Sequence, residues 1–365
     1  MAVAGKDTDD ASGRSHQRFH HWHDPDPHAI GATAMEFLHR LQGPTCIHLT
    51  GRDRGRCRVV ATLLHGNEPS GLFALFELLR LGLRPAVNLL CFIPSVDAAK
   101  RAPGFAHRML PDCKDLNRCF GDPRQHSTGD TEADRIAREM MALIDQARPE
   151  CVVDIHNTSG SSPSFGISTV MAPRHCALIA LFTQRIIITE LRLGSLMERT
   201  RSDMPIVTIE CGGAENREST LLAGEGLTRY FSLKNVFETG STGPAGPAEM
   251  SLEYFHHPMR LELAEGSAIA YGERGLVEDG VTLLPSVENH NFGHVCADTP
   301  LGFVAGELGD NLRLRTDGGA GAGAVGDYFR LERGRLYPRR RLKLFMVTTN
   351  PEIARKDCMF YLTEA

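Results

Sequence analysis

Apolar and polar positions along the first two thirds of the chain follow two alternating spacings, one typical of strands and one typical of helices. Short apolar runs predict buried strands at residues 46–49, 59–64, 87–93, 151–155 and 206–209. Apolar residues at helical spacing predict helices at residues 32–41, 72–81, 172–193 and 216–231, and another from a cap at Asp130 or Thr131 to about residue 147. Because strands and helices alternate, we expect an α/β domain.

Beyond about residue 235 the pattern changes to short alternating runs separated by turn residues. These runs lie at residues 259–263, 281–284, 312–314 and 342–347, after a Gly/Pro-rich stretch at residues 240–247. Such spacing predicts a small β-rich domain. We therefore expect an α/β domain over residues 29–238 and a β-rich C-terminal domain over residues 239–365.

The N-terminal residues 1–28 are rich in Asp, Gly, Ser and His, and this composition predicts a flexible arm. Within the arm, His20, His21, His23 and His28 carry imidazoles that can bind a transition metal. The simpler interpretation is a polar arm that is solvated, and we favour it.

The composition is that of an ordinary globular protein, with 42% hydrophobic and 23% charged residues in a chain of 365. A net charge of −5 gives no electrostatic reason to expect nucleic acid or an anionic membrane as partner, so attraction for an acidic substrate must come from local arginines. Ten cysteines without a Cys-x-x-Cys pair fit a reducing compartment. We see no apolar signal-peptide core and no bilayer-spanning stretch, and we expect a cytoplasmic protein.

The segment with the clearest chemistry is His65-Gly66-Asn67-Glu68, which follows the apolar run at residues 59–64. An imidazole nitrogen and a carboxylate oxygen suit Zn²⁺, and a catalytic zinc takes three protein ligands and a water. A His-x-x-Glu pair alone is a weak signal, because such residues often share a solvated turn. The pair therefore requires a third ligand and a base elsewhere in the chain.

Two other predicted strands end in residues with the required chemistry. The run at residues 151–155 is followed by His156, and the run at residues 206–209 is followed by Glu210. Side chains at strand ends project into the crevice outside the sheet. We expect His65, Glu68 and His156 to bind the metal and Glu210 to act as the base, although Glu210 can alternatively cap the following helix.

Asp154 lies two residues before His156, so along an extended strand both side chains face the same side. Its carboxylate can orient the imidazole of the proposed ligand. The alternative is an ordinary acid near a strand end, and the sequence leaves both open.

A polar stretch without periodicity, residues 95–129, is long enough to be a functional loop. It contains Arg101, Arg108, Asn117 and Arg118. Taken alone, the Asn-Arg pair is best interpreted as a turn residue beside a surface arginine.

Four blocks occur in an order that resembles the succinylglutamate desuccinylase/aspartoacylase family of the zinc carboxypeptidase clan. They are His65 to Glu68, Asp115-Leu116-Asn117-Arg118-Cys119-Phe120, Asp154 to Thr158, and Ile209-Glu210-Cys211-Gly212. The resemblance covers about residues 55–235. It implies an α/β fold with a mixed central sheet flanked by helices, like that of zinc carboxypeptidases, a smaller β-rich C-terminal domain, and one Zn²⁺ per chain.

The resemblance also implies roles for several arginines. In this family the Asn-Arg pair, here Asn117 and Arg118, binds a substrate carboxylate, which suits the planar fork of a guanidinium. A further arginine polarises the scissile carbonyl, and Arg108 is the nearest candidate, with Arg101 as the alternative. A second carboxylate-binding arginine corresponds to Arg199.

Relatives also carry a tyrosine in the C-terminal domain that closes over the substrate. The stretch at residues 347–359, where we expect it, contains no tyrosine. Tyr361, Tyr337 and Tyr328 are the candidates.

The function implied is that of a zinc-dependent amidohydrolase that deacylates an N-acyl amino acid carrying an acidic moiety, of the N-acetylaspartate or N-succinylglutamate type. The alternatives are a zinc carboxypeptidase acting on small peptides and a zinc-binding protein that no longer catalyses. The expected partner is the small-molecule substrate, without nucleic acid or membrane, and a homo-oligomer is possible.

Overall fold

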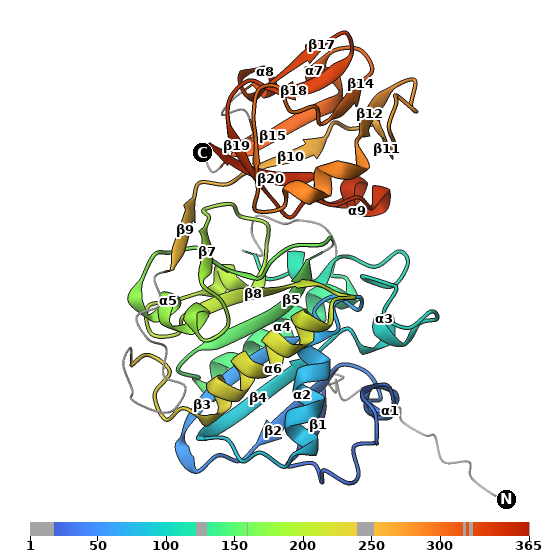
Figure 1. Ribbon diagram of the computed structural model, residues 1–365. Coiled ribbons are helices and arrows are strands. Elements are labelled where there is room, and N and C mark those ends of the chain that lie inside the picture. Colours follow the sequence, from blue (N-terminus) through green and yellow to red (C-terminus); the bar gives the residue numbers. More distant parts are fainter. Residues whose placement is uncertain are drawn as a thin grey trace, which may run out of the picture.

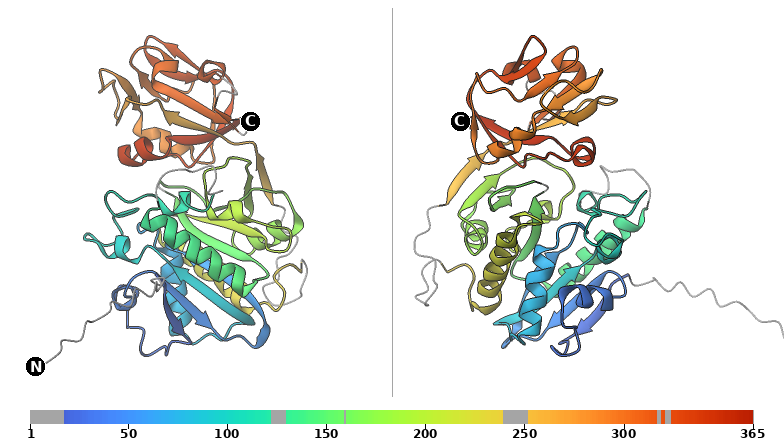
Figure 2. Two further views of the ribbon diagram at one scale, coloured as in Figure 1. Left: turned by 180° about the vertical axis from the view of Figure 1, so that it is seen from behind. Right: turned by 45° about the vertical axis from the view of Figure 1, so that its right-hand side comes forward.

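The computed structural model describes residues 18–121, 130–158, 160–238, 252–316, 319–320 and 324–364. An α/β part contains a nine-stranded sheet, and a β-rich part contains sheets of six and five strands (Figure 1). Figure 2 shows the β-rich part stacked on one end of the α/β part. The expected fold class, a mixed central sheet with helices and a smaller β-rich C-terminal region, is confirmed.

The nine-stranded sheet has the order β1-β2-β4-β3-β5-β8-β6-β7-β9. Its strands are β1 (His20–His23), β2 (Thr45–Leu49), β3 (Asp53–Thr62), β4 (Val87–Ile93), β5 (Val152–Thr158), β6 (Phe165–Ser168), β7 (Arg185–Ile188), β8 (Ile206–Gly213) and β9 (Glu253–His256). Its helices are α1 (Ala34–Arg40), α2 (Ser70–Arg80), α3 (Val96–Lys100), α4 (Glu132–Ala147), α5 (Pro173–Ala180) and α6 (Arg217–Ser232), with short 3₁₀ turns η1 (Leu116–Arg118) and η2 (Leu196–Arg199).

The β-rich part carries the remaining elements of the described residues. Its strands are β10 (Met259–Leu263), β11 (Ala268–Tyr271), β12 (Gly280–Leu283), β13 (His294–Val295), β14 (Gly302–Val304), β15 (Leu312–Thr316), β16 (Gly319–Ala320), β17 (Phe329–Glu332), β18 (Arg335–Pro338), β19 (Leu342–Phe345) and β20 (Phe360–Glu364). Its helices are α7 (Leu308–Asn311), α8 (Val325–Tyr328) and α9 (Pro351–Lys356), with a 3₁₀ turn η3 (Pro285–His290).

The centre of the large sheet consists of the parallel strands β3, β5 and β8, which are apolar on both faces because helices cover both. On one face, Val60 and Val153 share a core with residues of α2 and α6. On the other face, Val59 and Val152 pack in a core with residues of α4. Since the three strands are parallel, their carboxyl ends meet at one edge of the sheet, toward the β-rich part (Figure 1).

Most helix predictions for the α/β part agree with the structure within a few residues. Thr131 caps α4 in a reciprocal capping box with Asp134, as the cap signal indicated. The helix predicted over residues 172–193 is wrong in its second half, because α5 ends at Ala180 and Arg185–Ile188 form β7. Three consecutive isoleucines favour a strand, and pairing of β7 with β6 and β9 outweighs the helical spacing.

The prediction of a flexible arm to residue 28 is wrong for its last part. Residues 20–23 form β1, which pairs in parallel with β2. Apolar contacts explain why: the Trp22 ring packs 6.1 Å from Phe37, and Phe19 packs 5.3 Å from Phe92. The expected arm over residues 1–17 lies outside the described residues.

Three predictions fall wholly or partly outside the described residues. They are the domain boundary at residue 239, the junction at residues 240–247 and part of the loop at residues 95–129. The strand that follows the boundary, β9, still pairs with β7 in the large sheet. The β-rich part therefore begins at β10, later than predicted. Among the helices that the structure describes, none is long and apolar enough to cross a membrane.

Arg58 is a fully buried cation that ties β3 to the end of α6. Its Nη1 donates to the carbonyl oxygens of Tyr230 at 2.6 Å and Leu233 at 2.8 Å, and its Nε donates to Glu150. Truncating Arg58 would leave a cavity and remove the donor to the Tyr230 and Leu233 carbonyl oxygens and one of the two arginines that pair with Glu150.

We therefore expect Arg58→Ala to lower the free energy of unfolding by about 3–5 kcal/mol, measured by urea denaturation. The matched control is Arg56→Ala, because Arg56 pairs with the same Glu150 but its side chain is 38% exposed. Arg56→Ala is expected to lower the free energy of unfolding by less than about 1 kcal/mol. Equal losses in the two variants would contradict the importance of the buried cation.

Candidate active site

The segment after β3 brings His65 and Glu68 to the carboxyl edge of the sheet. Gly66 lies between them, and a Cβ there would be 2.6 Å from the His107 carbonyl oxygen and 2.7 Å from the Ala99 nitrogen. Only glycine fits such an approach. The Gly66 N–H donates to the Arg108 carbonyl oxygen at 2.9 Å, so the turn also positions the loop that carries Arg108.

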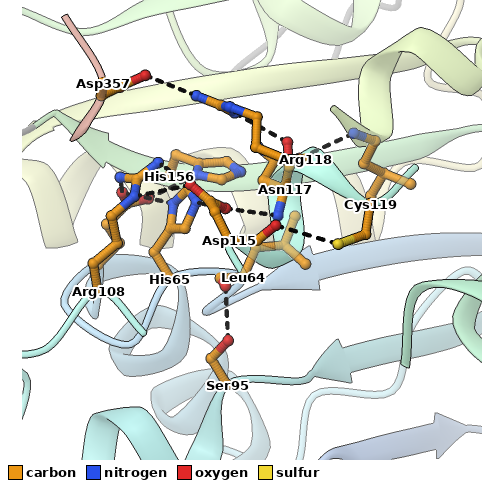
Figure 3. Close-up of polar contacts among 12 residues, drawn as sticks. Leu64, His65, Ser95, Arg108, Asp115, Asn117, Arg118, Cys119, His156 and Asp357 are labelled. Atoms are coloured by element: carbon orange, nitrogen blue, oxygen red, sulfur yellow. Dashed lines mark hydrogen bonds and ion pairs between the residues drawn. The ribbon is translucent and has the colours of Figure 1, made fainter. Parts of the chain in front are cut away.

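His65, Glu68 and His156 converge in a buried group whose possible ligand atoms lie within 4.8 Å of one another. Figure 3 shows the two histidines beside Arg108 and Asp115. The Nδ1 atoms of His65 and His156 face different oxygens of Glu68, at 2.8 and 2.6 Å. His65 and Glu68 come from the turn after β3, and His156 comes from β5. The predicted ligand set is therefore brought together.

The other ring nitrogen of each histidine faces a second carboxylate. His65 Nε2 is 3.0 Å from Asp115 Oδ1, and His156 Nε2 is 2.8 Å from Asp154 Oδ2. If each Nε2 carries the proton and donates it, each Nδ1 is left as a lone pair directed at Glu68. The orienting interpretation of Asp154 is supported by this contact.

This donor set fits a divalent cation. Without a metal, positive charge on the two histidines holds the pKa of Glu68 below its ordinary value, although burial by itself would raise it, so the carboxylate stays charged. A divalent cation can supply this positive charge in place of protons on the two Nδ1 atoms. Imidazole and carboxylate ligands suit Zn²⁺.

Glu210 lies on β8 opposite His156 of β5 in the strand register. Burial raises the pKa of its carboxyl to about 7, against the opposing effect of His156. Its Oε2 is buried and has no hydrogen-bond partner among the described residues. A carboxyl with such a pKa and a free oxygen can accept and return a proton near neutral pH. Glu210 lines the same cavity as the candidate metal ligands His65, Glu68 and His156.

Arg108 contacts Glu68, one of the three candidate metal ligands, directly. Its Nη1 is 3.2 Å from Glu68 Oε1, and its Nε and Nη2 donate to Asp115 Oδ2 at 3.1 and 3.0 Å. Arg108 lines the cavity, whereas the alternative, Arg101, is exposed and does not. Of the two arginines considered from the sequence, Arg108 is therefore the one that lies beside His65, Glu68 and His156.

Asn117 and Arg118 lie in η1 and both line the cavity. Asp115 begins this turn and accepts the Asn117 N–H at 2.8 Å. Arg118 Nη2 donates to Asp357 Oδ1 of the β-rich part at 2.9 Å (Figure 3). Arg199, at the end of η2, is not among the residues that line this cavity.

The β-rich part closes the cavity from the opposite side. It contributes Pro258, Met346, Ile353, Asp357 and Tyr361 to the lining. Of the three tyrosines considered from the sequence, Tyr361 is the one at the cavity. The remaining wall is largely apolar, with Ile167, Ile187, Leu191, Leu193 and Met197.

The sequence analysis missed Asp357 and Asn157. Asn157 donates to the Gly212 carbonyl oxygen at 2.9 Å, and its Oδ1 accepts the Ser70 N–H at 3.0 Å, which joins β5 to β8 and α2. Its position directly after His156 is the only signal that could have indicated a role. For Asp357 the sequence offers no signal, because its contacts come from a distant part of the chain.

Comparisons with known proteins agree with this arrangement. Residues 58–224 match the family model of the succinylglutamate desuccinylase/aspartoacylase catalytic domain. No curated protein matches the chain significantly.

Several solved structures share the fold. The succinylglutamate desuccinylase/aspartoacylase from Rhodobacter sphaeroides is 18% identical with a TM-score of 0.54, over 87% of this chain and 88% of that one. The succinylglutamate desuccinylase from Chromobacterium violaceum is 16% identical with a TM-score of 0.52, over 87% and 88%. Murine aminoacylase 3 is 18% identical with a TM-score of 0.52, over 86% and 96%. At these identities the likeness establishes the fold.

The contact between Asp154 and His156 predicts a loss of metal affinity when the carboxylate is removed. We expect Asp154→Asn to bind Zn²⁺ about 10–100-fold more weakly, because the amide orients the imidazole but no longer increases its basicity. Competition with a chelator measures the affinity. Asp97→Asn, which changes an exposed aspartate, is the control and should bind as the unaltered chain does. Unchanged affinity in Asp154→Asn would argue against a contribution of the Asp154 carboxylate charge to metal binding.

Proposed function

We propose that this chain is a zinc-dependent amidohydrolase that deacylates a small N-acyl amino acid. The match of residues 58–224 to the family model of the succinylglutamate desuccinylase/aspartoacylase catalytic domain supports this proposal. The observation that carries the proposal is the convergence of two imidazole nitrogens on Glu68, with Glu210 in the same cavity. The buried Oε2 of Glu210 has no hydrogen-bond partner among the residues that the structure describes. A structural zinc usually has four protein ligands and needs no base.

His65, Glu68 and His156 are the proposed zinc ligands. When bound, the ion supplies Lewis acidity, which polarises the amide carbonyl and lowers the pKa of a water. Asp115 and Asp154 hold the two imidazoles in the orientation that leaves each Nδ1 available. Three protein ligands leave one position for water and substrate.

Glu210 is the proposed general base. It removes a proton from the attacking water and then gives that proton to the departing amine. Burial, which raises the pKa of this carboxyl, favours its ability to hold the proton between the two transfers. Arg108 holds its guanidinium beside Glu68, where it can stabilise the negative charge that develops on the carbonyl oxygen.

Asn117 and Arg118 are proposed to bind a carboxylate of the substrate. In the absence of substrate, Asp357 occupies one side of the Arg118 guanidinium, so an incoming carboxylate competes with it or shares the cation. Arg199 is outside the cavity lining, and we do not carry it into the proposal.

Two substrate types fit different features of the cavity. The arginines favour an acidic moiety, as in N-acetylaspartate or N-succinylglutamate. The apolar wall formed by Ile167, Ile187, Leu191, Leu193 and Met197 favours an N-acyl amino acid with an apolar side chain or acyl group. Closure of the cavity by residues of the β-rich part, such as Met346 and Ile353, argues against long peptides.

A substrate panel tests the reaction class. The zinc-loaded chain is incubated with N-acetylaspartate, N-succinylglutamate, N-acetylphenylalanine and a short peptide, and release of the amino acid is measured. We expect turnover of at least one acyl amino acid and little of the peptide, because the cavity is closed on the side of the β-rich part. Preference for the peptide would favour a carboxypeptidase, and bound zinc without any turnover would favour a non-catalytic zinc protein.

The role of Glu210 predicts that metal binding and catalysis can be separated. We expect Glu210→Gln to keep its zinc and to lose about 10²–10⁴-fold in kcat, because an amide cannot accept the proton. Metal analysis and steady-state kinetics on the best panel substrate give the two readouts. Glu190→Gln, at an exposed position, is the control. Comparable kcat values for Glu210→Gln and the unaltered chain would refute the assignment.

A further inference from the structure

A second group of metal-binding side chains lies at the other end of the large sheet. The parallel register of β1 and β2 pairs His21 with Cys46 and His23 with His48. Since side chains on a strand alternate between faces, all four project from the same face of the sheet. Figure 1 shows these strands at the end of the α/β part that is remote from the β-rich part.

Three of these residues converge. One ring nitrogen of His21, one of His48 and the Cys46 sulfur lie within 4.8 Å of one another. His21 Nδ1 is 2.7 Å from His48 Nε2, and the His23 ring stacks on His48 with centroids 4.3 Å apart. Cys46 is fully buried and His21 and His48 are half-buried, so the group is protected on one side and accessible on the other.

A hydrogen bond between the two imidazoles does not account for the group. His21 has a second ring nitrogen, Nε2, which is buried and has no hydrogen-bond partner among the described residues. A buried polar atom without a partner carries a cost in stability. The Cys46 thiol, also beside the pair, is a free cysteine.

We propose that His21, Cys46 and His48 form a binding site for a thiophilic divalent cation, with Zn²⁺ as the first candidate. A thiolate with two imidazoles is a donor set that zinc and copper prefer, whereas calcium and magnesium prefer oxygen ligands. Three protein ligands leave a fourth position to water. The site is separate from the candidate active site, since β4 and β3 lie between β2 and β5.

Zinc binds a cysteine as the thiolate, and it binds an imidazole through a ring nitrogen that carries no proton. Binding at Cys46 therefore forms a metal–sulfur bond and breaks the S–H bond, and the proton passes to solvent.

A cation at this position would cross-link the edge of the sheet. β1 is four residues long and pairs only with β2 among the described strands. His21 belongs to β1, and Cys46 and His48 belong to β2, so one ion joins both strands. The expected role is structural, because it holds the N-terminal strand against the sheet.

Cobalt binding distinguishes this site from the candidate active site. Cobalt(II) bound to a thiolate has a near-ultraviolet charge-transfer band, which His65, Glu68 and His156 cannot produce because they include no cysteine. The untagged full chain, freed of metal, is titrated with Co²⁺ and with Zn²⁺, and the bound metal is measured. We expect about two ions per chain and a thiolate band, and about one ion without the band in Cys46→Ser and His48→Ala.

Two further variants keep the result interpretable. His21→Ala changes a residue of the edge strand β1, so it should lose the thiolate band even if Cys46→Ser folds poorly. Cys113→Ser is the control, because Cys113 is exposed, and it should keep the band. Circular dichroism establishes that each variant is folded, and hydrolysis by zinc-loaded His48→Ala should match the unaltered chain. About one ion per chain without a thiolate band, or a band that survives in His21→Ala and His48→Ala, overturns the proposal.

Discussion

The arrangement around Glu68 depends on one electrostatic constraint. A buried carboxylate that faces two imidazole nitrogens at hydrogen-bond distance requires positive charge, and the surrounding residues are placed accordingly. Asp115 and Asp154 fix the two rings from behind, and Arg108 neutralises part of the negative charge. The parallel strands β3 and β5 make this possible, because their carboxyl ends deliver side chains from distant segments to one place.

The cavity belongs to both parts of the molecule. The α/β part supplies the three candidate metal ligands, Glu210 and the apolar wall. The β-rich part supplies Asp357 and Tyr361. The pKa of Asp357 lies below its ordinary value: burial would raise it, but Arg260, Arg118 and Arg108 outweigh this effect. The ion pair between Arg118 and Asp357 therefore joins the two parts of the molecule at the cavity.

Much of the α/β part could be predicted from local sequence. Apolar runs indicated β3, β5 and β8, and the cap at Thr131 indicated the start of α4. The group of His65, Glu68 and His156 could be predicted because each residue lies in or just after the carboxyl end of a strand, and these ends meet in a parallel sheet. Strand β7 was predicted as part of a helix, because the apolar residues around it have helical spacing. The strands that pair with it, β6 and β9, are distant in the sequence, so local sequence could not indicate the pairing. Asp357 could not be predicted, since it contacts Arg118 from 239 positions away in the chain.

The short connection between β9 and β10 has a mechanical consequence. Strand β9 is held in the large sheet and β10 opens the β-rich part, with only His257 and Pro258 between them. A two-residue connection allows one part to rotate relative to the other but allows little translation, and the proline ring restricts the backbone rotation at Pro258. Pro258 also lines the cavity, so this connection forms part of the cavity wall. A rotation of one part relative to the other about this connection would therefore pivot beside the cavity.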